Sequence, residues 1–321
     1  MLQCERVKIV YHPNYNISFG GLERLHPFDS RKYGRAWDAL HGQFGKRLDE
    51  IWLKPERPIS EDELRLVHST EYLRQLRSAT QLARILELPF LALVPARVTD
   101  YCVLRPMRWA TMGTLLAARQ ALRTGRAVNL SGGYHHAKPG GGEGFCVYAD
   151  VAVAVRVLRQ ERTLANTDGI IHIDLDAHQG NGVCHCFMPD QNFFTFDMFN
   201  ADIYPSHDIE ARRRIDCPVP LASGCGNAEY LKLLREKLPE FLDFVCHTTR
   251  ARLAFYNAGT DVYEGDALGR LSLSAKGVLE RDRFVFEELK RRALPTVMLL
   301  SGGYSRESFR LVTRTVEWLL R

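Results

Sequence analysis

The sequence has no long hydrophobic run. Its longest apolar stretch, around Leu88 to Ala96, contains Pro89 and Pro95. It is far shorter than the ~20 residues that a helix needs to cross a bilayer. The N-terminus carries charges early and has no apolar core segment, so we expect no secretory signal. These absences predict no membrane span and make a cytoplasmic location the default expectation.

Dense cysteine and clustered basic charge are also missing. The eight cysteines among 321 residues are too sparse for a secreted disulfide scaffold. Cys184 and Cys186 flank His185, but this is a weak metal motif because no second cysteine pair accompanies it. The net charge is only +5, and the longest basic run, Arg212–Arg214, is typical of a solvated loop. We expect no direct nucleic-acid binding, and the pattern leaves the oligomeric state open.

Repeats, low-complexity tracts and Gly/Ser linkers are absent, so residues 1–321 are expected to form one domain. Short β-branched runs alternate with amphipathic stretches. This order predicts an α/β fold with right-handed crossovers and a mostly parallel sheet covered by helices on both faces. The predicted strands are Val7–Tyr11, Ala127–Leu130, Gly169–Asp174, Phe193–Asp197, Leu253–Asn257 and Thr296–Leu300. The predicted helices are Arg108–Arg123, Asp150–Gln160, Ala228–Leu242, Ser274–Arg292 and Ser305–Leu320.

Polar residues gather where five of these strands end. The clusters are Ser131–His136, Asp174–His178, Asp197–Asn200, Asn257–Asp261 and Ser301–Tyr304. In an open parallel sheet the carboxyl ends of the strands lie along one edge, and ligands bind there. We therefore expect these distant segments to converge on a single site.

A metal site is predicted from Asp176, His178 and Asp261. Residues two apart in an extended segment point the same way, so Asp176 and His178 can reach one ion. Asp261 follows another strand and can supply a third ligand. Three nitrogen and oxygen ligands plus a water are typical of catalytic zinc. The alternative is that Asp176 caps the following helix and His178 packs in a hydrogen-bonded network.

Candidate proton-transfer groups lie in two of the other clusters. His135 and His136 follow a Gly-Gly pair, and imidazole suits a general base near neutral pH. A single buried histidine would account for only one of them. Asp174 is the natural carboxylate to orient His135. Tyr304 follows Gly303 in a flexible turn, and its hydroxyl could donate to a developing oxyanion.

Glycines and aromatic residues suggest how a substrate would be held. Gly144, beside Gly140–Gly142, allows the backbone to approach a ligand closely. No phosphate-loop or dinucleotide-binding context surrounds these glycines, so a nucleotide is not expected. Phe145 and Phe199 are candidates for the walls of a narrow apolar channel, although isolated aromatic residues more often belong to the core.

Taken together, these segments resemble the zinc-dependent histone deacetylases of the arginase/deacetylase superfamily, and class IV of that family matches best. The similarity covers nearly the whole chain. It is carried by Tyr11–Asp29, Gly140–Asp150, His172–Gly182, Tyr256–Ser274 and Ser301–Ser305.

The resemblance implies a central eight-stranded parallel sheet and assigns roles to the site. Asp176, His178 and Asp261 would bind one zinc ion, and His135 with His136 would form the acid/base pair. Tyr304 would polarise the carbonyl and Asp174 would support His135. Asn181 stands where nuclear deacetylases carry a carboxylate behind the second histidine. Class IV members also carry asparagine there. This departure from the nuclear enzymes leaves open which histidine is the base. A structural monovalent cation, K⁺, would be held by Asp174, Asp197 and carbonyls of Asp176, His178 and Met198.

The predicted activity is removal of acyl groups from lysine ε-amines of a protein or peptide, with long fatty acyl chains preferred over acetyl as in class IV relatives. An acetylpolyamine amidohydrolase and a catalytically weak acyl-lysine binding protein remain alternatives. A binuclear manganese ureohydrolase is disfavoured, because Gly180 and Tyr263 stand where its bridging carboxylates would be needed.

Overall fold

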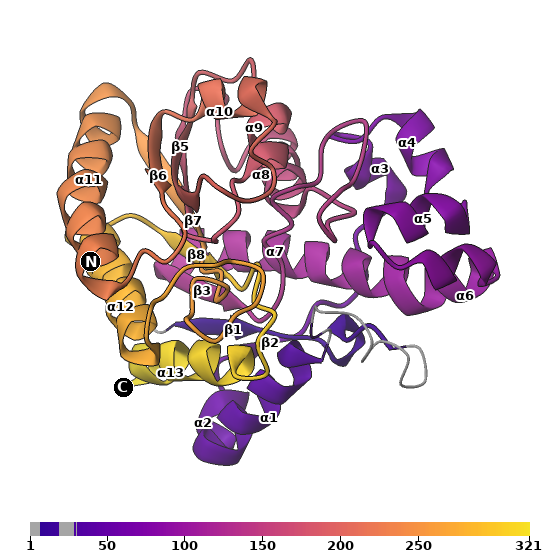
Figure 1. Ribbon diagram of the computed structural model, residues 1–321, viewed down its shortest axis with the longest axis horizontal. Coiled ribbons are helices and arrows are strands. Elements are labelled where there is room, and N and C mark those ends of the chain that lie inside the picture. The colour runs from indigo at the N-terminus through magenta and orange to yellow at the C-terminus, as the bar shows by residue number, and fades with distance from the viewer. Residues whose placement is uncertain (1–6, 19–28, 30) are drawn as a thin grey trace.

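The computed structural model describes residues 7–18, 29 and 31–321, which form a single α/β domain (Figure 1). An all-parallel, eight-stranded sheet has the order β2-β1-β3-β8-β7-β4-β5-β6. This architecture confirms the predicted fold class. The strands are β1 (Lys8–Val10), β2 (Trp52–Leu53), β3 (Arg126–Asn129), β4 (Gly169–Asp174), β5 (Phe193–Asn200), β6 (Cys217–Leu221), β7 (Ala251–Asn257) and β8 (Thr296–Leu299).

Helices connect the strands, and one follows the last strand. The first group is η1 (Pro13–Tyr15), α1 (Lys32–Phe44), α2 (Lys46–Asp49), α3 (Glu61–Leu64), α4 (Thr70–Gln75), α5 (Ala79–Ile85), η3 (Pro89–Leu93), α6 (Ala96–Thr99) and η4 (Asp100–Leu104). The second group is α7 (Arg105–Thr124), α8 (Asp150–Gln160), α9 (Asn181–Cys186), α10 (Ile209–Arg214), α11 (Asn227–Thr248), α12 (Ala275–Arg291) and α13 (Ser308–Leu320). Among the residues that the structure describes, no helix meets the length and apolarity needed to span a membrane.

The central strands are buried on both faces. Every residue of β4 and β8 is buried, which explains why their sequences are nearly continuous apolar runs. Helix α7 packs against α8 and against β1, β3 and β8, whereas α12 packs against α11 and α13, and α13 against α1. In Figure 1, α11, α12 and α13 run down one side of the sheet, and the short helices α3 to α6 form a lobe at the far end of α7.

The two strands that the sequence did not predict are short or edge strands. β2 has only two residues, too few for a period to show. β6 reads CPVPL and lies at the edge of the sheet, beyond β5. Proline has no N–H to donate to a neighbouring strand, so it is tolerated in an edge strand but not in a central one. Its presence therefore argues against a strand when the sequence alone is considered.

The five strands predicted to end in polar clusters are neighbours in the sheet, in the order β3-β8-β7-β4-β5. Asp174 at the end of β4 pairs in register with Asp197 of β5 on one side and Asn257 of β7 on the other. The register therefore brings all five clusters to one edge of the sheet, as expected from parallel strands.

Candidate active site

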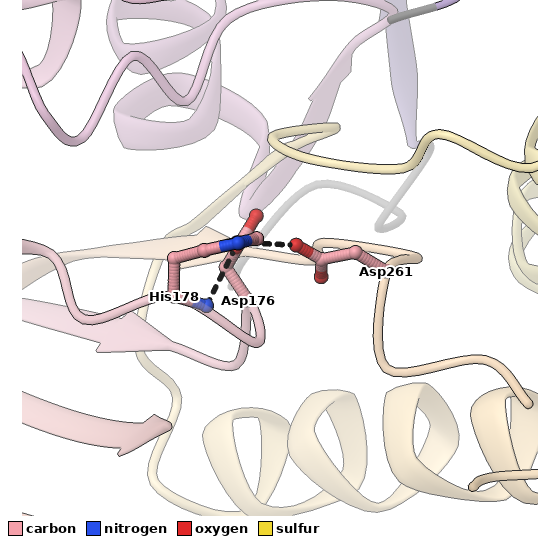
Figure 2. A group of neighbouring side chains, drawn as sticks. All are labelled: Asp176, His178 and Asp261. Carbon is pink, nitrogen blue, oxygen red and sulfur yellow. Dashed lines mark hydrogen bonds and ion pairs between the residues drawn. The ribbon is translucent and has the colours of Figure 1, made fainter. Parts of the chain in front are cut away.

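Asp176, His178 and Asp261 form a compact buried triad. One potential ligand atom from each residue lies within 4.8 Å of the other two. His178 Nδ1 is 3.2 Å from Asp176 Oδ1 and 2.9 Å from Asp261 Oδ2. Figure 2 shows that Asp176 and His178 come from one loop and Asp261 from another. The structure thus brings together the three predicted metal ligands, and it groups no other three metal-binding side chains in the part of the chain described.

The loop backbones hold these carboxylates in place. The N–H of Gly302 donates to Asp176 Oδ2 at 2.7 Å, and the N–H of Ala177 donates to Asp261 Oδ1 at 2.9 Å. A Cβ at position 302 would lie 2.5 Å from Asp176 Oδ2 and 2.6 Å from Asp261 Oδ2. Only glycine allows this approach, which explains the Gly-Gly pair after β8.

The charges at the triad fit a bound cation. Burial raises the pKa of Asp261 to about 7, with further help from the neighbouring Asp176 carboxylate. Although burial opposes it, contact with Asp176 and Asp261 raises the pKa of His178 to about 10. Two buried carboxylates and an imidazole therefore compete for protons, and a divalent ion would replace those protons while satisfying all three ligands. Two oxygens and one nitrogen are a donor set typical of catalytic zinc.

The two adjacent histidines lie beside the triad and differ in their partners. His135 Nδ1 is 2.8 Å from Asp174 Oδ2, and His136 Nδ1 is 2.8 Å from Asn181 Oδ1. Despite its burial, His135 has its pKa raised to about 9 by Asp174 and Asp176. Burial and the nearby charges of His135 and His178 lower the pKa of His136 well below its ordinary value. Environments that push two pKa values apart are typical of an acid and a base in one site.

Tyr304 reaches the same site from the loop after β8. Its ring makes edge contacts with Phe145 and His178 at centroid distances of 5.9 and 6.0 Å. Burial and the nearby carboxylates raise its pKa, so the hydroxyl stays protonated and able to donate. Gly303 adopts φ +134°, and Asp266 Oδ2 accepts the N–H of Tyr304 at 2.6 Å, so the turn that presents the phenol is fixed.

Two pockets adjoin at this site; we call them the inner and the outer chamber. The space between atoms, including the part open to solvent, is about 750 Å³ in the inner chamber and about 870 Å³ in the outer chamber. His136, Gly144, Phe145 and Tyr304 line both chambers and so lie where the two adjoin. Gly144 and Phe145, which the sequence predicted to contact substrate, therefore both lie in the walls of these chambers. The inner chamber is otherwise largely apolar, with Ile17, Tyr33, Leu86, Leu88 and Met107 in its wall.

Phe199 does not line either chamber, so the expectation that it walls the channel needs correction. It is buried in a small separate cluster with Cys184, Ala211 and Ile215. Its ring lies under the guanidinium group of Arg212, 5.2 Å from the ring centroid, within this cluster rather than at the site. Tyr204, rather than Phe199, is the aromatic residue in or just after β5 that lines the outer chamber. Its ring lies 5.1 Å from that of His136. An aromatic residue in the loop just after β5 was the available sequence signal.

Asp174 and Asp197 form a second buried carboxylate pair, close to the triad: Asp174 Oδ1 accepts the N–H of Asp176 at 3.2 Å. Asp197 Oδ2 accepts the N–H of Gly180 at 2.9 Å, whereas Asp197 Oδ1 is buried with no hydrogen-bond partner among the described residues. Burial and the neighbouring Asp174 raise the pKa of Asp197 well above its usual range. An orphaned carboxylate oxygen beside a second aspartate fits a monovalent cation. Met198, whose carbonyl was predicted to contribute, follows directly in β5.

Two buried cations that the sequence patterns did not mark support the site loops. Lys32 Nζ donates to the carbonyls of Ser301 and Gly302 at 2.6 and 3.0 Å. Arg281 Nη1 donates to the carbonyls of Leu175 and Gly259 at 3.0 and 2.7 Å, which ties together the loops that carry Asp176 and Asp261. Neither residue belongs to a polar cluster at a strand end. The predicted motif Tyr11–Asp29 falls in part on residues 19–28, outside the described residues.

Comparison with known proteins agrees with this geometry. A model of the histone deacetylase domain matches residues 26–319. Histone deacetylase 2 of Arabidopsis thaliana is 39% identical over 316 residues, covering 98% of this chain and 79% of that protein. An uncharacterized protein of Picosynechococcus sp. is 33% identical over 314 residues, covering 95% of each chain.

Solved structures show the same fold at lower identity. The crystal structure of the HDA15 HD domain superposes with a TM-score of 0.75 at 20% identity, over 98% of this chain and 91% of that chain. An HDAC homolog from Aquifex aeolicus gives a TM-score of 0.73 at 21% identity, over 98% and 84% of the two chains. Because the domain match and the Arabidopsis relative each span most of the sequence, the chain belongs to the histone deacetylase family, whose members hydrolyse amide bonds.

Proposed function

We propose that this protein is a zinc-dependent deacylase that removes acyl groups from lysine ε-amines of proteins or peptides. The observation that supports this most directly is that His136 and Tyr304 line both chambers, while His178 of the triad lies in the wall of the outer chamber. An acyl-lysine entering from the outer chamber would present its amide carbonyl where the two chambers adjoin.

The protein's own residues supply proton transfer and orientation. A zinc ion held by Asp176, His178 and Asp261 would polarise the acyl carbonyl and lower the pKa of a water molecule. His136, neutral and with Nδ1 engaged by Asn181, accepts the proton of the attacking water at Nε2 and returns it to the lysine nitrogen as the C–N bond breaks. The Tyr304 hydroxyl donates to the carbonyl oxygen as negative charge develops there. His135, held by Asp174, is a charged neighbour that stabilises the same developing charge.

The apolar inner chamber supports a preference for long acyl chains, as proposed for a class IV member. A fatty acyl chain that passes the catalytic residues would meet a mainly apolar wall, to which Leu86, Leu88 and Met107 contribute. Each CH₂ buried there gains about 0.8 kcal/mol. An acetyl group would gain little from the same wall, so the longer chains should be hydrolysed with the higher kcat/KM.

The competing functions fit the geometry less well. For a binuclear ureohydrolase, a side chain at position 180 would have its Cβ 2.6 Å from Asp174 Oδ2, which leaves no space for a bridging carboxylate. A pure acyl-lysine binding protein would not need Tyr304, His135 and His136 beside the triad. The outer chamber has Glu87 and Asp202 in its wall, which would suit a polyamine, but Arg270 lies among them and offsets one of the two negative charges.

We also propose that Asp174 and Asp197 hold a structural K⁺ ion, which would satisfy the orphaned Asp197 Oδ1. Replacing K⁺ by a large organic cation in the buffer should lower the melting temperature. An unchanged melting temperature across these buffers would refute this part of the proposal.

The test of function is a substrate panel. Acetyl-, octanoyl- and myristoyl-lysine peptides and acetylated polyamines are assayed with and without a chelator, and the chelated protein is then reloaded with zinc. We expect chelator-sensitive turnover, highest on the longer acyl peptides. Equal or faster acetyl hydrolysis would refute the chain-length preference, and turnover confined to polyamines would replace lysine by the polyamine as substrate.

A further inference from the structure

A buried polar network continues from His136 on the side away from the triad. Its centre is Asn181, at the start of α9 and fully buried. Asn181 Oδ1 lies 2.8 Å from His136 Nδ1, and Asn181 Nδ2 donates to Glu143 Oε1 at 2.6 Å and to Asp208 Oδ2 at 2.9 Å. Every polar atom of this amide side chain therefore has a partner.

The two outer carboxylates are held in their charged form. Lys138 Nζ lies 2.9 Å from Glu143 Oε1 and 3.0 Å from Asp208 Oδ2, and His185 Nε2 lies 3.0 Å from Asp208 Oδ2. Although partial burial opposes it, these partners and Asn181 lower the pKa of both carboxyl groups. An ionised carboxylate can only accept hydrogen bonds.

This restriction fixes the orientation of the Asn181 amide. With Glu143 and Asp208 both acceptors, the NH₂ group must face them. The reverse orientation would set Oδ1 against two carboxylate oxygens, which repel it, and would leave Oδ1 without a donor. The carbonyl oxygen of Asn181 consequently faces His136, and only a protonated Nδ1 can donate to it.

We propose that Glu143 and Asp208 are positioning residues that fix the Asn181 amide and, through it, the tautomer of His136. The second ring nitrogen, Nε2, then carries the lone pair that faces the chambers. This inference rests on the proposed function, in which His136 accepts a proton. It gives a physical reason why asparagine can stand where a carboxylate would otherwise orient the histidine. Glu143 and Asp208 bind the NH₂ group of Asn181, so only its carbonyl oxygen is left to accept from His136.

The first test removes both carboxylates and preserves the cap of α10. The double variant Glu143→Met/Asp208→Ser lacks the carboxylates that face Asn181, and serine can still cap α10 through the N–H of Ala211, as Asp208 does. The exposed Glu71→Met, in α4, is the matched control. Long-range proton–nitrogen NMR of the histidine-labelled full chain reports which ring nitrogen is protonated, and loss of one signal set in His136→Gln assigns the resonance among the eleven histidines.

We expect His136 to show only the Nδ1–H form in the native protein and in the control, and a mixture of both forms in the double variant. With an acyl-lysine substrate, kcat should fall about 10–100-fold while KM stays near its native value. A single Nδ1–H form in the folded double variant, or an Nε2–H form in the native protein, would overturn the proposal. The NMR result does not depend on turnover, so it separates this inference from a failure of the proposed function.

The second test inverts the polarity of the network. Asn181→Asp alone places three carboxylates together and should lower kcat strongly. Adding Glu143→Gln and Asp208→Asn supplies amide donors to the new carboxylate, which can still accept from His136 Nδ1–H. The triple variant should recover about tenfold or more in kcat over Asn181→Asp. A triple variant no better than Asn181→Asp, at equal melting temperature, would contradict the network. This comparison also serves if the double variant does not fold.

Discussion

Replacing Tyr304 by phenylalanine isolates one hydroxyl group in the proposed reaction. The ring contacts with Phe145 and His178, at 5.9 and 6.0 Å between centroids, do not involve that oxygen and should persist. The backbone stays anchored because Asp266 binds the N–H of residue 304, whatever its side chain. Stability should therefore change by no more than about 1 kcal/mol.

The effect on turnover should be much larger. Loss of one preorganised oxyanion donor typically costs 10²–10³ in kcat, or about 2.7–4 kcal/mol. KM should change little, because the hydroxyl donates most strongly when the oxyanion forms. Since the pKa of Tyr304 is raised, the hydroxyl is protonated throughout the neutral range, and the ratio of native to variant kcat should be constant from about pH 7 to 9.

The assay is steady-state hydrolysis of an acyl-lysine peptide, with zinc content measured on the same samples. Tyr101→Phe is the matched control, because Tyr101 is 66% exposed and lies in η4, outside the active site. Near-native kcat in Tyr304→Phe would remove the hydroxyl from the reaction. A variant that has lost its zinc would show that Tyr304 acts on the metal site instead, and its assignment as an oxyanion donor would be wrong.

Three further predictions concern the metal, the acyl chamber and stability. Asp261→Ala should abolish zinc retention, because it removes one of three ligands; full zinc occupancy by elemental analysis would refute the ligand assignment. Met107→Trp should fill part of the inner chamber. It should lower kcat/KM for myristoyl-lysine at least tenfold more than for acetyl-lysine, because about 1.4 kcal/mol of apolar burial is lost. An equal loss on both substrates would place the acyl chain elsewhere. Burial lowers the pKa of His68 to about 4, and its Nε2 accepts the N–H of Ala149. The unfolded chain binds this proton near pH 6.5 and the native protein does not, so stability should fall by up to about 3 kcal/mol as pH drops from 7 to 4. In urea unfolding, the free energy of unfolding of His68→Gln should fall less between pH 7 and pH 4 than that of the native protein. An identical fall in both proteins would contradict this role of His68.

Local sequence patterns predicted the centre of the site because its chemistry is local. Asp176 and His178 lie two apart in an extended segment, and such side chains share a side whatever surrounds them. Asp261 and Tyr304 could be added because parallel strands align their carboxyl ends at one edge. The polar clusters after β3, β4, β7 and β8 therefore predicted the site before any packing was known.

Other site residues could not be predicted this way. Phe199 looked like a channel wall, but packing places its ring in a small core cluster under Arg212, and Tyr204 in the following loop lies beside His136 instead. The edge strand β6 was hidden by its prolines. Lys32 and Arg281 act through contacts with carbonyls 269 and 106 residues away in the chain, and no sequence period encodes such pairings.

The sequence by itself predicted the βαβ order, the grouping of Asp176, His178 and Asp261, and the histidine pair beside them, because strand periodicity and strand-end polarity are properties of neighbouring residues. Only the tertiary structure decided which buried residues orient the side chains of the site. Glu143 and Asp208 reach Asn181 across 38 and 27 residues, and their acceptor-only chemistry orients its amide. That orientation arises from packing three distant segments into one buried volume, where every donor must meet an acceptor.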